Sequence, residues 1–344
     1  MANYKNFLKW GFITLIIILT KQSVPLYVQA QGTEALNVQG AILGVHDPVM
    51  IKDGDYYYLF TTGGGIPVRR SKDMLNWRIP QGALPFLQMP EEAYAYVPDA
   101  TDIWAPDISY YNDLYHLYYA VSTFGSNHSA IGLATNPTLD PSADNFKWTD
   151  QGIVISSDYS DFYNAIDPNL IIDEDGNAWL AFGSFWGGIK LVQLDYETGK
   201  LPESADGAGP ELYSLATREE NSRSVEAPFI IYRNGYYYLF VSFDFCCQGI
   251  HSTYNVRVGR SESIKGPYLD RDGVPMMEGG GTQITFPTKR YKGPGHNAIF
   301  SEDGQDYIVY HAYDAYQGGT STLRIEPLQW DEEGWPSIVG VEQP

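Results

Sequence analysis

The chain has 344 residues with 42 acidic and 22 basic side chains, and its formal net charge is −20 at pH 7. This charge disfavours nucleic acid, anionic membranes and polyanionic substrates as partners. Aromatic residues make up 15% of the chain, which suits β-strands and the stacking of sugars in a cleft.

The first 30 residues have the features of a secretory signal peptide. Two lysines give a basic start, an apolar run covers residues 11–20, and Val28-Gln29-Ala30 resembles a small-residue cleavage site. The apolar run is short for a membrane span, although a retained membrane anchor is the alternative. We therefore predict removal of residues 1–30 and a secreted or periplasmic protein without membrane contact. Residues 31–344 are predicted to form one domain.

After the leader, one short motif recurs five times at a step of about 60 residues. Each copy has an apolar strand, a turn of the Asp-Gly, Asn-Gly or Asn-Asp type, and an aromatic strand. The copies begin at His46-Asp47-Pro48, Trp104-Ala105-Pro106, Ile166-Asp167-Pro168, Glu226-Ala227-Pro228 and Gly295-His296-Asn297. The aromatic strands are predicted over residues 56–60, 115–119, 179–182, 236–240 and 307–310.

Further strand-like runs complete the units, at residues 129–134, 189–195, 255–261 and 323–330. Three or four strands in each repeat, without a convincing amphipathic helix, are typical of a propeller blade. We predict an all-β fold: a five-bladed β-propeller with four-stranded antiparallel blades around a central channel. A long β-sandwich is the alternative.

Four of the five copies carry a proline at the start of the first strand, where a missing N–H group is tolerated. Proline also favours an extended conformation in the residue that precedes it. The first strand of each blade lines the channel of a propeller, so the polar residues beside these prolines are predicted to converge at one channel mouth. They are Asp47, Asp107, Asp167, Glu226 and His296.

Asp47, Asp167 and Glu226 are the candidate catalytic residues. Crowded carboxylates repel one another, which raises at least one pKa and places an acid beside a base. Glycoside hydrolysis needs this pairing of a protonated and an ionised carboxyl group. The alternatives are a structural role for any one of these acids, a sugar-binding propeller without catalysis, or a propeller used only for protein interaction.

The two cysteines of the chain, Cys246 and Cys247, are adjacent and lie in the fourth unit. A disulfide framework is excluded by this arrangement. The pair either closes a vicinal disulfide or stays reduced as buried packing residues.

An ordered set of motifs resembles the α-1,5-L-arabinanases of glycoside hydrolase family 43. The resemblance runs from about Val45 to the C-terminus. The motifs are His46-Asp47-Pro48-Val49, Trp104-Ala105-Pro106-Asp107-Ile108, Ala165-Ile166-Asp167-Pro168, Gly183-Ser184-Phe185-Trp186-Gly187-Gly188, Ser224-Val225-Glu226-Ala227-Pro228-Phe229, Phe245-Cys246-Cys247-Gln248-Gly249, Ser252-Thr253-Tyr254, Val258-Gly259-Arg260-Ser261 and Gly295-His296-Asn297-Ala298.

This resemblance implies an inverting mechanism on a five-bladed propeller. It implies that Asp47 is the general base, that Glu226 is the general acid, and that Asp167 orients Glu226 and modulates its pKa. Inverting enzymes hold the acid and base carboxyl groups about 6.5–9.5 Å apart to leave room for the attacking water.

The resemblance also implies a substrate groove. Its aromatic lining would be Trp104, Phe124 and Phe185, with Asn164 and Ser184 as polar contacts. Core packing is the alternative for the aromatic residues, most of all for Phe124 and Phe185.

His296 has an imidazole where the other copies carry carboxyl groups. The resemblance implies that it ligates a calcium ion in the central channel, with waters supplying the remaining ligands. A hydrogen-bonded structural histidine is the alternative.

We therefore predict hydrolysis of α-1,5-linked arabinan and arabino-oligosaccharides by an endo-acting monomer. The alternatives within the enzyme class are an exo-acting arabinofuranosidase or a β-xylosidase of the same family. The endo or exo choice depends on loops that close or open one end of the groove.

Overall fold

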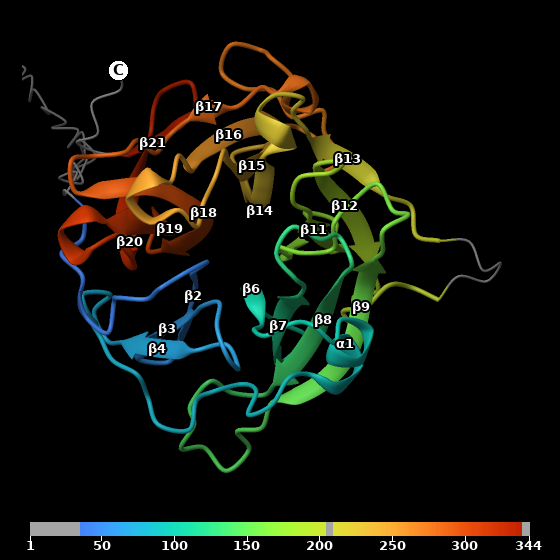
Figure 1. Ribbon diagram of the computed structural model, residues 1–344, viewed down its shortest axis with the longest axis vertical. Coiled ribbons are helices and arrows are strands. Elements are labelled where there is room, and N and C mark those ends of the chain that lie inside the picture. Colours follow the sequence, from blue (N-terminus) through green and yellow to red (C-terminus); the bar gives the residue numbers. More distant parts are fainter. Residues whose placement is uncertain (1–34, 204–208, 339–344) are drawn as a thin grey trace, which may run out of the picture. The chain divides into compact units, whose positions relative to one another are not determined.

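The computed structural model describes residues 35–203 and 209–338. Five antiparallel sheets are arranged radially about a common centre, as predicted (Figure 1). The predicted signal peptide at residues 1–30 lies outside the described residues. Within the described part of the chain, no helix is long and apolar enough to cross a membrane.

The strands follow one another from the centre outward in each blade. Blade I contains β2 (Val49–Asp53), β3 (Tyr56–Phe60) and β4 (Val68–Ser71). Blade II contains β6 (Trp104–Tyr111), β7 (Leu114–Val121), β8 (Ser129–Asn136) and β9 (Thr149–Ser157). Blade III contains β10 (Asn169–Ile172), β11 (Ala178–Phe182), β12 (Ile189–Leu194) and β13 (Tyr213–Ala216). Blade IV contains β14 (Val225–Arg233), β15 (Tyr236–Phe243), β16 (Asn255–Ser261) and β17 (Thr282–Gln283). Blade V contains β18 (Tyr291–Glu302), β19 (Gln305–Asp314), β20 (Thr320–Trp330) and β21 (Pro336–Ile338).

Blade I departs from the predicted four strands. Its sheet has three strands, and β5 (Asn76–Trp77) pairs instead with β1 (Gln39–Gly40) in parallel, with one bridge from Arg70 to Arg78 linking this pair to β4. The described residues also include a short helix, α1 (Glu91–Tyr96), and the 3-10 turns η1 (Asn221–Arg223), η2 (Gly249–His251), η3 (Met276–Glu278) and η4 (Ala315–Gln317).

Tight turns join the first two strands of three blades. Both turn residues have positive φ in Asn112-Asp113, Asn234-Gly235 and Asp303-Gly304. This conformation matches the right-handed twist of the flanking strands, and Asn, Asp and Gly adopt it most readily. The turn motif of the sequence thus sets the register of these hairpins.

A separate hydrophobic core lies between each pair of neighbouring blades. The strand β3 shows how one sequence serves two cores: Tyr58 and Phe60 pack toward blade II, whereas Tyr57 and Leu59 pack toward blade V. Side chains of a strand alternate between the two faces of its sheet, so a blade buried on both faces needs an uninterrupted apolar strand.

The ring closes between blade V and the beginning of the described chain. The N–H of Leu36 donates to Ile325 O (3.0 Å), the N–H of Gly44 donates to Ser321 O (2.8 Å), and Leu323 donates to Ile42 O (3.0 Å). The segment 36–44 therefore lies along β20. Its hydrogen bonds hold blade I and blade V together, which fixes the positions of residues 45–47 at the centre.

Candidate active site

The five motif copies place one residue each in the same unusual backbone conformation. Each residue has a positive φ, and the set is Asp47 (48°), Ala105 (43°), Asp167 (57°), Ala227 (54°) and His296 (50°). The prediction of an extended residue before each proline is therefore wrong. The strand pairing shifts register next to these residues in blades II, IV and V, as at a β-bulge, and a bulge redirects side chains.

Equivalent backbone positions correct the alignment of the repeats. Asp47, Asp167 and His296 occupy the left-handed position, whereas Glu226 precedes it by one residue and Asp107 follows it by two. The spacing of about 60 residues does not reveal these offsets, because the loops between blades differ in length.

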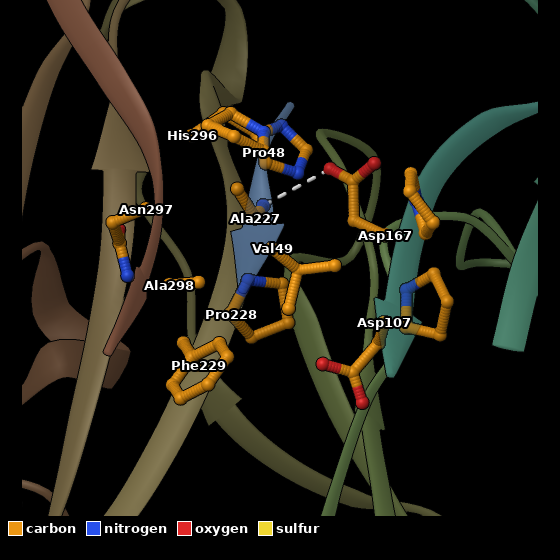
Figure 2. A pocket seen from close by; sticks show the side chains of 12 residues that line it. Pro48, Val49, Asp107, Asp167, Ala227, Pro228, Phe229, His296, Asn297 and Ala298 are labelled. Atoms are coloured by element: carbon orange, nitrogen blue, oxygen red, sulfur yellow. Dashed lines mark hydrogen bonds between the residues drawn. The ribbon is translucent and has the colours of Figure 1, made fainter. Parts of the chain in front are cut away.

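Asp107 does not join the other polar residues at the mouth, so this part of the prediction is wrong. It is 3% exposed, and its carboxylate accepts hydrogen bonds from Leu170 N (2.8 Å) and Asn169 Nδ2 (3.2 Å) of blade III. Figure 2 shows Asp107 at the opposite end from His296 of a narrow pocket that is lined by residues from all five blades. Burial raises the pKa of Asp107 to about 7, although these two donors oppose the shift. Its contacts join blade II to blade III.

Asp47 is surrounded by hydrogen-bond donors. Its Oδ1 lies 2.8 Å from His46 Nδ1 and 3.0 Å from His296 Nδ1, and its Oδ2 accepts a hydrogen bond from Thr62 Oγ1 (2.5 Å). Burial alone would raise the pKa of Asp47, but the charges and hydrogen bonds of His296 and His46 outweigh it and hold this pKa well below its usual range. Asp47 is therefore ionised at neutral pH, as a general base must be.

Two histidines form a stack behind Asp47. The rings of His46 and His311 have centroids 3.9 Å apart, and His311 Nδ1 accepts a hydrogen bond from Asp47 N (3.1 Å). His311 is fully buried, and burial together with the nearby His46 lowers its pKa well below the usual value. A neutral His311 can accept from Asp47 N and so fixes the backbone of this residue.

Glu226 is held by two hydroxyl groups. Ser184 Oγ donates to Oε2 (2.7 Å), and Tyr254 OH donates to Oε1 (2.6 Å). Ser184 follows β11 in blade III, and Tyr254 precedes β16 in blade IV, so neighbouring blades fix both oxygens. This arrangement orients the carboxyl group without placing a cation on it.

Asp167 lies deeper than Glu226 and is 6% exposed. Its Oδ2 accepts a hydrogen bond from Ala227 N (3.0 Å), the residue that follows Glu226. Burial raises the pKa of Asp167 to about 8; His296 opposes this shift, and the negative charges of Glu226 and Asp47 add to it. The crowding of acids thus raises one pKa, although burial is the larger cause.

The residues predicted to bind substrate differ in their exposure. Phe124 is 83% exposed, and Phe185 and Trp104 are half-buried, with the ring of Phe185 6.2 Å from that of Phe245. Asn164 is 2% exposed, and its Oδ1 accepts a hydrogen bond from Ser129 Oγ (2.7 Å). A sugar contact remains a prediction for each of these residues.

Sequence reasoning missed several residues that surround the carboxylates. They are His46, Thr62, Tyr254, His311 and Tyr313. His46 and Tyr254 lie inside motifs of the resemblance and could have been found there. Thr62 and His311 lie just after or within the aromatic second strands, and only the pairing of first and second strands brings them to Asp47.

The surroundings of His296 are compatible with a cation that keeps mostly water ligands. Its Nδ1 pairs with Asp47, an arrangement typical of metal-binding histidines, which donate one ring N–H to a carboxylate and ligate through the other nitrogen. Burial disfavours a charge on His296, but Asp47, Asp167 and Glu226 outweigh it and raise its pKa to about 9. A cation bound to His296 Nε2 would take the place of the proton on that nitrogen. The negative charges of the neighbouring carboxylates would attract it as they attract the proton.

A second grouping, His46, Asp47 and His311, also has ligand atoms close to one another. These atoms already bind one another, since His46 Nδ1 and Asp47 Oδ1 form an ion pair and His311 Nδ1 accepts from Asp47 N. Direct ligation there would break these contacts, so this grouping suits a cation less well than His296.

The geometry can be compared with known proteins. The family model of glycosyl hydrolases family 43 matches residues 42–336, which is nearly the whole described chain. The chain belongs to glycosyl hydrolase family 43. The first of its repeated motifs begins at His46, close to the start of this match, and the last blade ends at Ile338, close to its end.

Two relatives in family 43 are similar over most of their length. The chain is 48% identical over 299 residues to the extracellular endo-α-(1→5)-L-arabinanase 1 of Bacillus subtilis, covering 85% of this chain and 87% of that protein. It is 44% identical over 305 residues to the extracellular exo-α-(1→5)-L-arabinofuranosidase of Cellvibrio japonicus, covering 86% of each. The solved structure of the Cellvibrio cellulosa α-L-arabinanase with arabinohexaose has a TM-score of 0.81 at 42% identity, covering 86% of this chain and 96% of that one.

Proposed function

We propose that this family 43 enzyme hydrolyses α-1,5-linked L-arabinan and arabino-oligosaccharides with inversion at the anomeric carbon. The observation that carries the proposal is the convergence of Asp47, Asp167 and Glu226 in a chain that is similar to proteins named arabinanases and α-(1→5)-L-arabinofuranosidases. The acidic surface is consistent with a neutral polysaccharide as substrate.

Asp47 would act as the general base. Its two histidine partners and Thr62 keep the carboxylate ionised and fix its direction, so it can take a proton from a water that attacks the anomeric carbon.

Glu226 would act as the general acid that protonates the leaving glycosidic oxygen. Ser184 and Tyr254 hold its two oxygens, and Asp167 holds the next backbone N–H. Asp167 would therefore orient Glu226 through the backbone N–H of Ala227. Removal of a properly placed general acid reduces turnover by about 10²–10⁴-fold.

Endo action is the favoured mode, because the relative named as endo-acting has the higher identity of the two described above. Exo action is the second candidate, since the Cellvibrio japonicus relative is named as exo-acting. Both relatives are named extracellular, which supports action outside the cytoplasm by a secreted or periplasmic protein. A monomer is proposed as the acting form.

A calcium ion is also proposed in the channel, held by His296 and waters. When bound, it would supply positive charge near Asp47 and Asp167, which would favour the ionised forms of these two carboxyl groups.

A product time course tests the proposal. Purified protein is incubated with linear α-1,5-arabinan, and early products are separated by size. A ladder of oligosaccharides supports endo action, whereas a single short product from the start supports exo action. NMR of the first product should show the β-anomer, the inverted configuration. Release of xylose from xylan oligomers, with no product from arabinan, would overturn the substrate.

A further inference from the structure

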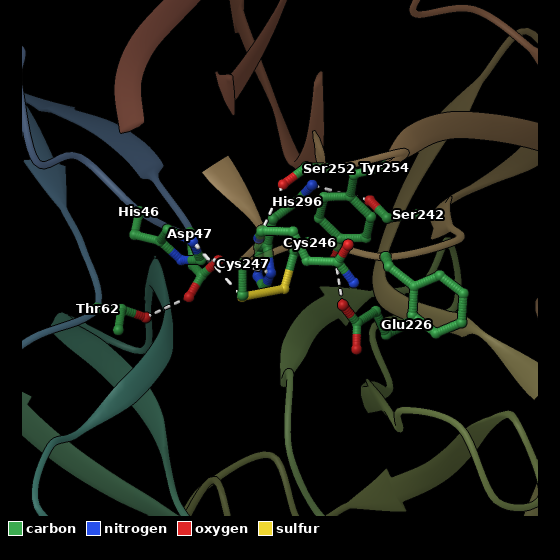
Figure 3. Close-up of a disulfide and its surroundings, with 12 residues drawn as sticks. His46, Asp47, Thr62, Glu226, Ser242, Cys246, Cys247, Ser252, Tyr254 and His296 are labelled. Atoms are coloured by element: carbon green, nitrogen blue, oxygen red, sulfur yellow. Dashed lines mark hydrogen bonds and ion pairs between the residues drawn. A yellow bond between two sulfur atoms is a disulfide. The ribbon is translucent and has the colours of Figure 1, made fainter. Parts of the chain in front are cut away.

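The two adjacent cysteines form a disulfide in the loop between β15 and β16. Cys246 is half-buried and Cys247 is exposed, so part of the disulfide faces solvent. Figure 3 shows it at the catalytic centre, with His46 and Asp47 to one side and Glu226 to the other. The proposed mechanism uses neither sulfur atom.

A chain of hydrogen bonds connects the disulfide to the proposed base. Cys247 N donates to Tyr313 OH (2.7 Å), Tyr313 OH lies 3.0 Å from His46 Nε2, and His46 Nδ1 lies 2.8 Å from Asp47 Oδ1. Cys247 Sγ is itself 3.9 Å from His46 Nε2. Two side chains, Tyr313 and His46, therefore connect the disulfide loop to Asp47 through hydrogen bonds in series.

The same loop is also connected to the proposed acid. Thr253 N and Tyr254 N both donate to Phe245 O, at 3.0 and 3.1 Å, which closes the loop behind the cysteines. The next contact along this path is Tyr254 OH to Glu226 Oε1 (2.6 Å). One short segment is thus connected to both proposed catalytic carboxyl groups, to Glu226 through Tyr254 and to Asp47 through Tyr313 and His46.

The exposed part of the disulfide differs chemically from the charged and polar side chains around it. Asp47, Glu226, His46 and His296 present charges and hydrogen-bonding groups, whereas a disulfide presents only carbon and polarisable sulfur. A furanose ring has one face of C–H groups besides its hydroxyls. A rigid apolar surface can pack against such a face while the polar groups bind the hydroxyls.

We propose that the Cys246–Cys247 disulfide is a wall of the sugar-binding cleft and packs against the arabinofuranosyl unit held between Asp47 and Glu226. This inference rests on the proposed function and deepens it, because it assigns a specificity-determining contact to the same site. The adjacency of the cysteines matters: the bond between them keeps both sulfurs in one surface, with no thiol hydrogen to orient. Such a bond persists in the oxidising environment outside the cytoplasm.

The test compares binding and turnover in a double variant, Cys246→Ala with Cys247→Ala. Binding of arabinohexaose is measured by calorimetry in a Glu226→Gln background, with and without the double substitution, and KM and kcat are measured in the otherwise unchanged protein. The contact predicts that Kd and KM rise about five- to tenfold for a few tens of Å² of lost apolar contact. It predicts that kcat changes less than about threefold and that Tm falls by only a few degrees.

Two controls keep the result interpretable. Val274→Ala removes an exposed apolar side chain on the outer edge of the same blade and should leave Kd unchanged. If the alanine pair does not fold, Cys246→Ser with Cys247→Ser keeps the side-chain size, and it should weaken binding by a similar factor because its hydroxyls are polar.

Three outcomes would overturn the inference. The first is a Kd of the double variant within twofold of the control. The second is a fall in kcat at unchanged Kd, which would mean that the loop only positions Asp47. The third is an equal loss of binding for arabinose and for an unrelated sugar. Failure of the proposed function would be visible separately, because the unsubstituted protein would then release no product from arabinan.

Discussion

His296 Nδ1 lies 3.0 Å from Asp47 Oδ1, which joins the last blade to the first at the place where the carboxylates converge. The two residues occupy equivalent left-handed positions in their motifs, so their side chains are directed into the channel by the same backbone device. The contact between His296 and Asp47 therefore helps to close the ring and also places the proposed base. Changes that loosen the contact between blades I and V should reduce activity as well as stability.

Thr62 tests whether the contact between blades I and II likewise serves both activity and stability. Its hydroxyl donates to Asp47 Oδ2 (2.5 Å) and accepts from Ala105 N (2.8 Å), so it links the base to blade II. Thr62→Val keeps the shape but removes both bonds and leaves the Ala105 N–H without a partner. We expect kcat to fall about tenfold and the free energy of unfolding to fall by about 1–3 kcal/mol. Steady-state kinetics and urea denaturation measure the two effects, and Thr62→Ser should restore both.

Glu226→Gln tests the assignment of the acid. The amide keeps the volume and can still accept from Ser184 or Tyr254, but it cannot give a proton to the leaving oxygen. We expect kcat on arabinan to fall by about 10²–10⁴-fold, with Tm within a few degrees of the unsubstituted protein. Glu262→Gln, at an exposed turn in the same blade, is the matched control. Retention of full activity in the Glu226 variant would remove this residue as the acid.

The fold could be predicted from the sequence because several independent features repeat together. Turn residues, aromatic strands and spacing recur together, and the strand predicted over residues 255–261 coincides with β16. The N-terminal pairing of segment 36–44 with β20 could not be predicted, because it joins segments that are remote in the sequence and share no motif. The missing fourth strand of blade I could not be predicted for the same reason, because β5 pairs with β1 of this N-terminal segment instead.

The site was predictable only in part. The three carboxylates stand out because each lies one or two residues before a proline of the repeat, but the repeat spacing aligned Asp107 and Glu226 with Asp47 incorrectly. A shift of one or two residues along a bulged strand changes where a side chain points, and the left-handed residues that cause the bulges carry no consistent sequence signal: they are aspartate, alanine and histidine. Second-strand residues such as His311 can be assigned to the site only once the pairing between the first and second strands is known.

Asp107→Asn distinguishes a structural acid from a catalytic one. Asp107 accepts bonds from Leu170 N and Asn169 Nδ2 and has a pKa of about 7, so the site does not require a charge. Asparagine keeps the shape and can accept from Leu170 N, although its Nδ2 cannot accept from Asn169 Nδ2. We expect kcat to stay within about threefold of the unsubstituted protein. Asp107→Ala should instead lose about 1–3 kcal/mol of stability, because Leu170 N would be left unpaired. A loss of activity in the asparagine variant without any loss of Tm would place Asp107 in the chemistry.

Removal of metal tests the proposed calcium ion. Dialysis against a chelator should lower activity, and added Ca²⁺ should restore it, if His296 and waters hold the ion beside the carboxylates. His296→Ala should be insensitive to both treatments, which makes it the matched control. Metal analysis of the untreated protein should find about one equivalent of Ca²⁺. Full activity after removal of all stoichiometric metal would contradict the proposal.

His116 should make the protein sensitive to acid at a place remote from the site. It is 2% exposed on β7, its ring stacks on Tyr111 at 3.8 Å between centroids, and its Nδ1 lies 3.2 Å from Leu114 O. Burial lowers its pKa to about 4, with the Leu114 carbonyl opposing part of the shift, whereas an unfolded chain has a histidine pKa of about 6.5. Between these two values the unfolded chain binds a proton that the folded protein does not, so stability falls as the pH falls through this window.

His116→Phe keeps an aromatic ring against Tyr111 and does not titrate. We therefore expect its Tm to fall less between pH 7 and pH 4.5 than that of the unsubstituted protein, by about 2–5 °C. Calorimetric scans at several pH values measure this difference, and His251→Phe, at an exposed position, is the control that should leave the pH dependence unchanged. If both variants follow the unsubstituted curve, another buried group, such as His311, dominates the acid response. If only the His116 variant is flattened, the packing between blades II and III is what excludes the proton, since the Tyr111 that covers His116 belongs to the core between those blades.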